Sequence, residues 1–290
     1  MYDSAIVIVS EIALALYPIL IKTVPTDIAT QLVSRLLTFS VLAYGLGSRS
    51  DVERTWGDAS SALNSFLLGL VTLFHVGSSY YAFEQLSTGV SMSLFYTYPF
   101  FNLLGAALLY SETINIYQFL LMVVAFMGVV LIAPELKEAF TGEKEADTKE
   151  PYNWKGVAAG LTAALSETVM YFAVKGSTQP NPFYSILQLY PGAFVALLGV
   201  LFFARKKIDL RPSVWMPMLL FNALIGFVGY AMRFYAIPHL STSIFSILSF
   251  IGVVAAFIWG YMFIMEVPSV KALIGAAMIT GAVGLSGAPV

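Results

Sequence analysis

The stretch from Tyr80 to Pro134 is present twice in this chain, and the duplication constrains the fold more than any other feature. Two short motifs recur 154 positions later: Tyr81-Ala82 as Tyr235-Ala236, and Leu86-Ser87-Thr88 as Leu240-Ser241-Thr242. Glu112 recurs as Glu266 at the same spacing, without a gap. Apolar sequences match one another by chance, so the shared order of Leu-Ser-Thr, an apolar run and one glutamate carries the argument. We interpret it as an internal duplication.

The composition places most of the chain in lipid. Of 290 residues, 58% are hydrophobic and 11% are charged, and the mean hydropathy is +0.80. Soluble domains carry about 25% charged residues. The net charge of -2 gives no indication of nucleic-acid binding, and the lack of cysteine excludes disulfides and thiol chemistry. Met1-Tyr2-Asp3 lacks the basic start of a cleaved signal peptide, so we expect the first apolar segment to remain as a membrane span.

Ten apolar windows have the length of a membrane-spanning helix, which needs about 20 residues. Continuous apolar runs in lipid favour helices, because helices satisfy their own backbone polar groups. The windows are 4–22, 28–46, 64–84, 89–110, 115–133, 154–174, 183–204, 214–235, 240–264 and 269–288. They predict an all-α integral membrane protein with a first repeat at 1–134, a polar linker at 135–153 and a second repeat at 154–290.

An odd number of spans in each repeat forces the second repeat to enter the membrane in the opposite sense. Inverted repeats of this kind are typical of transporters, with a site near the midplane between the halves. Ten spans also place both termini on the same side. The Lys and Arg residues concentrate in loops on the other side, which by the positive-inside rule places the termini outside the cytoplasm.

The motifs of the first repeat resemble a known family. They are Ala82-Phe-Glu-Gln-Leu-Ser-Thr, Leu94-Phe-Tyr-Thr-Tyr-Pro-Phe-Phe, Leu109-Tyr-Ser-Glu112 and the run that begins at Gly128. Together they are similar to the EamA-like domain of the drug/metabolite transporter superfamily. The resemblance implies a permease with both termini in the cytoplasm, contrary to the charge count, so both orientations remain open. The second repeat departs from the pattern, with Gly252-Val253 where the first has Tyr98-Pro99, and the first window holds Ser10-Glu11 where relatives often have Trp-Gly.

Ionisable groups inside the spans are the main candidates for function, because each is costly to place in lipid. Glu11 and Glu167 lie near mid-span in equivalent windows, each after a serine. We expect them to face one cavity, where one carboxylate carries a coupling proton or attracts a cationic solute. The alternative is a structural pair of a carboxylate with an arginine, such as Glu11 with Arg35. Helix rise places His75 at a similar depth, and its imidazole suits proton relay.

Mid-span tyrosines need hydrogen-bond partners and therefore favour a cavity wall. The resemblance implies that Tyr96 and Tyr98 line the central pocket. The full set of predicted substrate-binding residues is Glu11, Tyr17, Arg35, His75, Tyr80, Tyr96, Tyr98, Glu167, Tyr171, Tyr190 and Tyr230. Carboxylates with aromatic faces suit an organic cation or a zwitterion.

Other polar residues receive structural interpretations. We expect Glu112 and Glu266, at span ends, to anchor the spans or contact a helix start. Arg233 lies near the end of its window and is expected to reach the membrane surface, the alternative being contact with an anionic group of the solute. No catalytic or nucleotide-binding motif and no metal-ligand spacing occurs in the sequence.

The sequence thus predicts a secondary active transporter that moves a small organic solute, such as an amine, amino acid or related metabolite, by alternating access with proton or exchange coupling. Two alternatives remain: a passive facilitator or channel, and an exchanger of nucleotide sugars or phosphate esters. We expect no enzyme activity, cofactor, metal or nucleic-acid partner. The expected partners are the solute and the lipid bilayer, with a monomeric or weakly dimeric protein in a cell membrane.

Overall fold

The computed structural model describes residues 2–113, 115–132, 153–177 and 181–286, and all its regular elements are helices. The expected linker at 135–153 lies outside these residues except for Asn153. Eight helical segments are long and apolar enough to cross a membrane, and two shorter apolar helices accompany them. The first repeat contains α1 (Tyr2–Leu14), α2 (Tyr17–Thr23), α3 (Ile28–Leu46), α4 (Arg49–Trp56), α5 (Ala59–Gln85), α6 (Thr88–Phe95), α7 (Tyr98–Tyr110) and α8 (Ile116–Ile132). The second contains α10 (Trp154–Lys175), α11 (Pro182–Phe203), α12 (Pro212–Phe221), the π-helix η1 (Asn222–Phe227), α13 (Val228–Ala236), the 3₁₀-helix η2 (Ile237–His239), α14 (Thr242–Ser249), α15 (Ile251–Ile264) and α16 (Val270–Ser286).

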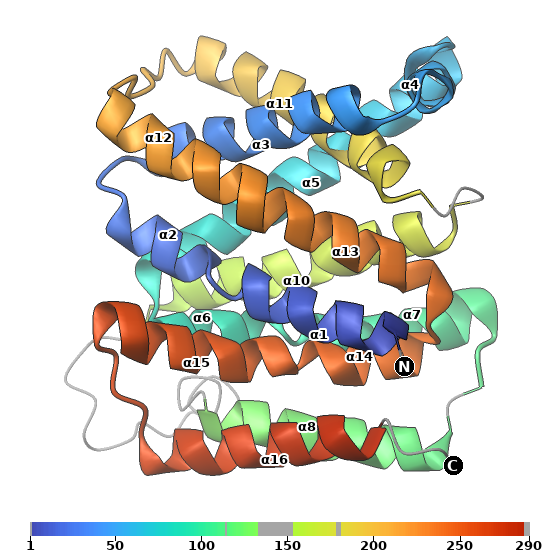
Figure 1. Cartoon of the computed structure of the whole chain (residues 1–290), viewed down its shortest axis with the longest axis vertical. Coiled ribbons are helices and arrows are strands. Elements are labelled where there is room, and N and C mark those ends of the chain that lie inside the picture. Colours follow the sequence, from blue (N-terminus) through green and yellow to red (C-terminus); the bar gives the residue numbers. More distant parts are fainter. Residues whose placement is uncertain (1, 114, 133–152, 178–180, 287–290) are drawn as a thin grey trace.

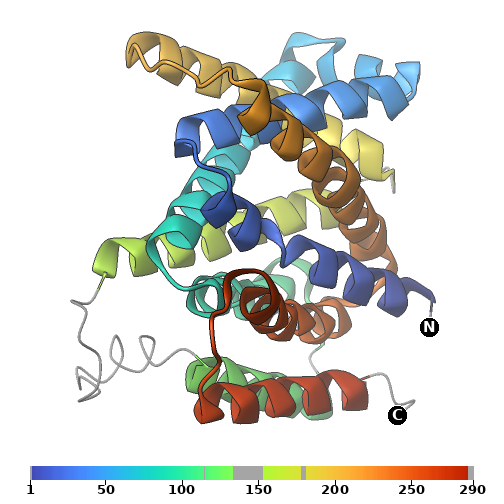
Figure 2. The same cartoon turned by 60° about the vertical axis from the view of Figure 1, so that its left-hand side comes forward.

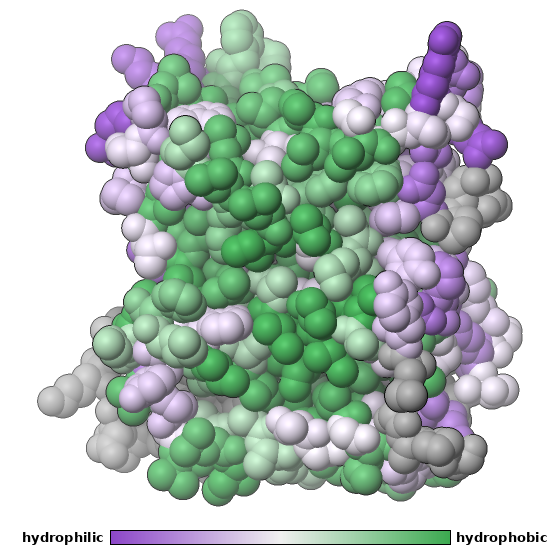
Figure 3. Space-filling view, viewed as in Figure 1, coloured by the Kyte–Doolittle hydropathy of each residue, from purple (hydrophilic) through white to green (hydrophobic). Residues whose placement is uncertain are grey.

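These helices form ten spans whose axes run from left to right in Figure 1, with both chain ends on the right. We call the side with the chain ends the terminal face and the other side the opposite face. In Figure 3 the middle of the molecule is apolar, and hydrophilic residues gather toward the left and right edges, where the helices end. Large apolar side chains are exposed along the spans, as in Phe74, Leu108 and Leu224. The all-α, ten-span fold predicted from the apolar windows is confirmed.

The two repeats pack mainly against each other. In Figures 1 and 2, α8 and α16 lie side by side at the bottom, while α5 packs against α10 and α11, and α3 packs against α11. The pairs α3 with α11 and α8 with α16 are equivalent helices of the two repeats. Equivalent elements can meet in this way only near the axis that relates the repeats, so residues on α3 and α11 that face inward lie close to that axis.

Three spans are interrupted near the middle. The first breaks between α1 and α2 at Ala15-Leu16, just before Pro18, and the fourth breaks between α6 and α7 at Tyr96-Thr97, just before Pro99. Proline lacks the N–H that a continuous helix needs and clashes with the preceding turn. The ninth span breaks at Phe250, the counterpart of Tyr96, without a proline. Interrupted helices are tolerated at membrane depth where the freed backbone groups are buried in protein or line a cavity.

Two glycines permit the close crossing of α5 and α11. A Cβ on Gly69 would lie 2.5 Å from the backbone nitrogen of Ala193, and one on Gly192 would lie 2.9 Å from the carbonyl oxygen of Ser65. Both obstructing atoms belong to the backbone, which cannot rotate away. Small residues at such crossings allow close van der Waals packing of helices in lipid.

Gly69→Ala is therefore expected to lower the free energy of unfolding by about 1–3 kcal/mol, the usual cost of overpacking. Gly77→Ala on the same helix is the matched control, because a Cβ there meets nothing within 4 Å. Alanine has the higher helix propensity, so the control should be neutral or stabilising. Thermal unfolding of the purified protein in detergent measures both. Equal midpoints for the two variants would contradict the packing argument.

Candidate functional site

Two buried carboxylates share one arginine at the centre of the molecule. Arg233 on α13 donates from Nη1 to Glu11 Oε1 at 2.5 Å, and its Nη2 lies 2.8 Å from Glu167 Oε1. Glu11 comes from α1 and Glu167 from α10, which are the equivalent first helices of the two repeats. All three side chains are at most 1% exposed. The guanidinium fork matches two carboxylates in a way that a single ammonium does not.

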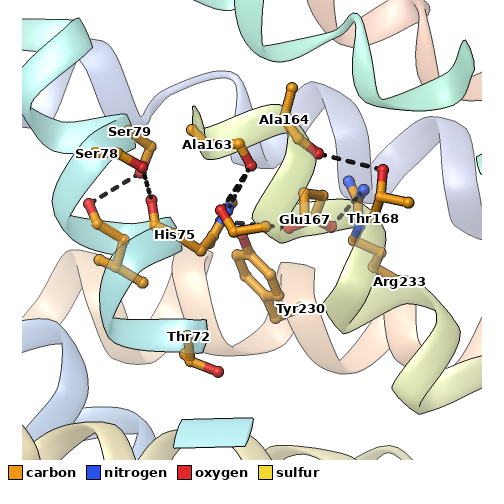
Figure 4. A network of polar contacts seen from close by, with 12 residues as sticks. Thr72, His75, Ser78, Ser79, Ala163, Ala164, Glu167, Thr168, Tyr230 and Arg233 are labelled. Atoms are coloured by element: carbon orange, nitrogen blue, oxygen red, sulfur yellow. Dashed lines mark hydrogen bonds and ion pairs between the residues drawn. The ribbon is translucent and has the colours of Figure 1, made fainter. Parts of the chain in front are cut away.

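His75 on α5 extends this cluster, as Figure 4 shows. Its Nδ1 lies 3.1 Å from the carbonyl oxygen of Ala163, and its Nε2 lies 3.3 Å from Glu167 Oε2 and 3.4 Å from the hydroxyl of Tyr230. A carbonyl oxygen can only accept, so Nδ1 carries the hydrogen of a neutral ring and Nε2 bears a lone pair. That lone pair can accept from the Tyr230 hydroxyl, and it also faces Glu167 Oε2, which has no hydrogen-bond partner among the described residues. A proton on Glu167 would relieve the repulsion between these two acceptors. We call Glu11, His75, Glu167 and Arg233 the central network.

Tyr96 secures Glu11 from the other side by donating its hydroxyl to Oε2 at 2.6 Å. The break at the end of α6 brings this side chain to the centre, and Gly252 makes room for it. A Cβ on Gly252 would lie 1.9 Å from the Tyr96 hydroxyl. The glycine that departs from the pattern of the first repeat thus has a structural reason. With Arg233 and Tyr96 as donors, both oxygens of Glu11 are satisfied.

A second arginine lies in a cage of aromatic rings instead of pairing with an acid. Among the described residues, no carboxylate lies within 4.0 Å of Arg35. Its guanidinium carbon lies 4.3–6.0 Å from the ring centroids of Tyr17, Tyr230, Phe39, Tyr80 and Tyr190. Its Nη2 donates to the hydroxyl of Tyr190 at 3.2 Å, and its Nε has no hydrogen-bond partner within the described chain. We call these five rings the aromatic cage.

The break in the first span positions the cage. Tyr17 begins α2 just after the break, and its hydroxyl donates to Asn222 Oδ1 at 3.1 Å. Asn222 opens the π-helix η1 and donates in turn to Ser34 Oγ at 3.2 Å. π-Helical turns are rare in proteins, and those that occur often lie at functional sites. Three separate helices therefore orient the ring that lies closest to Arg35.

A cavity of about 20 Å³ lies between the central network and the aromatic cage. It is lined by Leu14, Tyr17, Arg35, His75, Ser79, Phe83, Met92, Phe95, Tyr96, Tyr230 and Arg233. One water molecule needs about 10–15 Å³ of this kind of volume. The cavity is therefore too small for an organic solute in this conformation, and binding requires it to widen.

Matching contacts between the repeats close the two faces. At the opposite face, Glu266 accepts from the backbone nitrogen of Thr88 at 3.0 Å and pairs with Lys22 at 2.6 Å. At the terminal face, Glu112 accepts from the backbone nitrogen of Thr242 at 3.2 Å and lies 3.3 Å from Lys175. Each glutamate thus reaches the first residue of a helix in the other repeat, α6 or α14. We call these contacts the opposite-face lock and the terminal-face lock. The predicted helix-start contacts of Glu112 and Glu266 are confirmed.

The structure corrects two expectations about the arginines. The pair of Glu11 with Arg35 does not form, because Arg233 takes that position. The expectation that Arg233 reaches the surface is wrong, since its side chain is 1% exposed. The predicted window ended at residue 235, whereas the helical segment continues through η2 to His239 and places Arg233 deeper. The sequence did contain a signal for this. Two acidic residues were predicted at mid-span but only one arginine, so a second buried cation was needed to neutralise them.

The predicted tyrosines fall into separate groups. Tyr96 and Tyr230 line the cavity, as do Tyr17, Arg35 and His75. Tyr80 and Tyr190 belong to the aromatic cage, and Tyr98 lies under Arg233 with the guanidinium carbon 4.9 Å from its ring centroid. Tyr171 lies apart, where its hydroxyl donates to Thr242 Oγ1 at 3.1 Å, beside the terminal-face lock.

The model of the EamA-like transporter family matches twice, over residues 4–133 and 154–287. The chain belongs to this family. Among curated proteins, it is 21% identical over 224 residues to "Uncharacterized transporter YxxF" of Bacillus subtilis (strain 168), a match that covers 77% of this chain and 69% of that protein. A solved structure titled "Crystal structure of protein" covers 99% of this chain and 98% of its own, with a TM-score of 0.70 and 15% identity, which shows a shared fold. This member of the EamA-like family is therefore a multi-pass membrane transporter.

Proposed function

We propose that this protein is a proton-coupled secondary transporter for a small organic amine or amino acid, working by alternating access. The observation that carries the proposal is the contact of His75 Nε2 with Glu167 Oε2 at 3.3 Å. Nδ1 is directed at the Ala163 carbonyl oxygen, and neither oxygen of Glu167 has a hydrogen-bond partner among the described residues, so a proton on Glu167 would relieve the repulsion between this carboxylate and the Nε2 lone pair. Glu11 acts instead as the permanent counter-ion of Arg233.

Charge balance supports exchange of this proton for a cationic group. Two ionised carboxylates and one guanidinium leave the central network with one negative charge when His75 is neutral. A single proton between His75 and Glu167 neutralises it. An ammonium group of a solute would do the same, so proton and solute compete for one excess charge in a site that excludes water. Competition of this kind couples solute movement to a proton gradient.

The two locks are the contacts that would break when the transporter opens to one face or the other. Both locks are formed and the cavity is water-sized, which corresponds to an occluded conformation. Opening the opposite face would separate Glu266 from Thr88, and opening the terminal face would separate Glu112 from Thr242. Because the locks are equivalent under the repeat, the two open conformations would be related by the same pseudo-symmetry, as in other inverted-repeat transporters.

Glu167→Gln tests the proton site. In proteoliposomes with an imposed pH gradient and a trapped pH-sensitive dye, the wild type should show proton flux on addition of members of a panel of amines and amino acids. Glu167→Gln should lose at least about 90% of this flux, because a neutral amide binds no proton there. Glu84→Gln, an exposed glutamate on α5, is the matched control and should retain the flux.

A second measurement tests whether proton and solute share one charge. Exchange of labelled solute between equal internal and external pools requires no net proton movement, so it reports solute binding. Because Glu167→Gln removes the excess negative charge that proton and ammonium would share, the variant should lose most of this exchange as well. Proton flux of wild-type size in Glu167→Gln would remove this residue from the coupling mechanism. Wild-type uptake that reaches only the external concentration under a pH gradient would instead indicate a passive facilitator.

A further inference from the structure

Arg35 is a buried cation without an anion. Its side chain is 1% exposed, and the described chain offers it no carboxylate within 4.0 Å. Arg233, which is equally buried, has two carboxylate partners. Buried charges in proteins are normally paired, because an uncompensated one is costly. The aromatic cage offsets part of this cost, since a desolvated cation is attracted to the face of an aromatic ring.

The described chain offers the donors of Arg35 tyrosine hydroxyls but no anion. The guanidinium has five N–H donors; Nη2 donates to the Tyr190 hydroxyl, and the hydroxyls of Tyr80 and Tyr230 are further partners. Its Nε has no partner among the described residues. An arginine with free donors in a fixed fork fits a carboxylate bidentately. The rings hold the guanidinium in place, so little side-chain entropy is lost when an anion arrives.

The two arginines that line the cavity differ in their charge partners. Arg35 has no carboxylate within 4.0 Å among the described residues, whereas Arg233 binds Glu11 and Glu167, which do not line the cavity themselves. Arg233, His75 and Tyr96 therefore connect the cavity to a network that holds one excess negative charge. The lining also includes the apolar residues Leu14, Phe83, Met92 and Phe95. A solute with a carboxylate, an ammonium group and an apolar chain matches this arrangement.

We infer that the transported solute is a small zwitterion of the amino-acid class, and that Arg35 binds its carboxylate. The inference rests on the proposed function and narrows it, since simple amines would leave Arg35 without an anion. The ammonium group would then lie toward the central network. Arg35 thereby becomes the residue that separates amino acids from the amines that lack only the carboxylate.

Matched ligands test the assignment by binding alone. The panel comprises alanine, leucine and phenylalanine, the corresponding amines without the carboxylate (ethylamine, 3-methylbutylamine and phenethylamine), and the corresponding acids without the amino group. Thermal stabilisation of the purified protein gives apparent affinities. At least one amino acid should bind about tenfold to a hundredfold more tightly than its amine, the range of a charge-assisted hydrogen-bonded pair. It should also bind more tightly than its acid.

Two variants at Arg35 identify the residue responsible. Arg35→Gln should abolish the preference, so that the amino acid and its amine bind with about equal apparent affinity. Arg35→Lys keeps the positive charge and should retain part of the preference for the amino acid. This variant keeps the inference testable if Arg35→Gln does not fold. Stabilisation by no amino acid, equal binding of amine and amino acid to the wild type, tighter binding of the acid, or an unchanged preference in Arg35→Gln would each overturn the inference. Proton flux driven by the amines would still support the proposed transport, so the two failures are distinguishable.

Discussion

Arg233→Met is expected to lower the free energy of unfolding by about 3–5 kcal/mol and to abolish transport. Removing one partner of a buried ion pair leaves an uncompensated charge in low dielectric, and losses of this size follow. Here the variant would leave two carboxylates, Glu11 and Glu167, which now share the guanidinium at 2.5 and 2.8 Å. Methionine fills a similar volume, so the loss would report charge and not a cavity. Thermal unfolding in detergent, with the yield of monodisperse protein, measures the effect.

Neutralising both acids in the same background separates charge from packing. The triple variant Glu11→Gln, Glu167→Gln, Arg233→Met should recover most of the stability and none of the proton flux. Arg54→Met, an exposed arginine on α4, is the matched control and should unfold like the wild type. A triple variant as unstable as Arg233→Met alone would mean that the arginine contributes mainly through its contacts with Tyr98 and Phe245.

Weakening the two locks is expected to expose the cavity from opposite faces. Glu266→Gln removes the charge that binds Lys22 and the start of α6, so the opposite face should open more often. Glu112→Gln should do the same at the terminal face through Lys175 and α14. Both glutamates are about 30% exposed, which limits each contribution to roughly 1 kcal/mol. This corresponds to about a fivefold shift in population.

Because the chain contains no cysteine, a single introduced thiol can report the accessibility of the cavity from each face. Leu14→Cys introduces a single thiol on the cavity wall, and a membrane-impermeant thiol reagent applied to one face of oriented vesicles reports access from that face. Glu53→Gln, which removes a surface pair with Arg49 on α4, is the control and should leave both rates unchanged. Increased labelling from the same face in both lock variants would contradict the assignment of one lock to each face.

Most of the fold could be predicted from the sequence, because a chain that crosses a lipid bilayer needs long apolar segments. Continuous apolar windows located all ten spans, and the ends of most of them agree with the helices to within a few residues. The repeated Leu-Ser-Thr lies at equivalent helix starts in the structure, where Ser87 and Ser241 accept from the backbone nitrogens of Val90 and Ile244. Proline at residues 18 and 99 marks the breaks in the first and fourth spans. The break at Phe250 has no such mark, and no local pattern predicted it.

The candidate site could be predicted only in part. Helix depth placed Glu11 and His75 near the same level, and the repeat placed Glu167 opposite Glu11. Depth along a helix does not give rotation about its axis, however, so the partner of each charge could not be assigned. The predicted windows placed Arg35 near the centre and Arg233 near a span end, yet in the structure Arg233 pairs with both acids and Arg35 lies in the aromatic cage.

The sequence by itself determined that this chain crosses a membrane ten times as two inverted halves, because the cost of exposing backbone and charge to lipid acts on each segment separately. Only the tertiary structure decided which arginine neutralises the acids and which one stays without an anion. That choice depends on how helices of both repeats rotate and cross at the centre, where Gly252 admits Tyr96 and where residues far apart in sequence exclude water together.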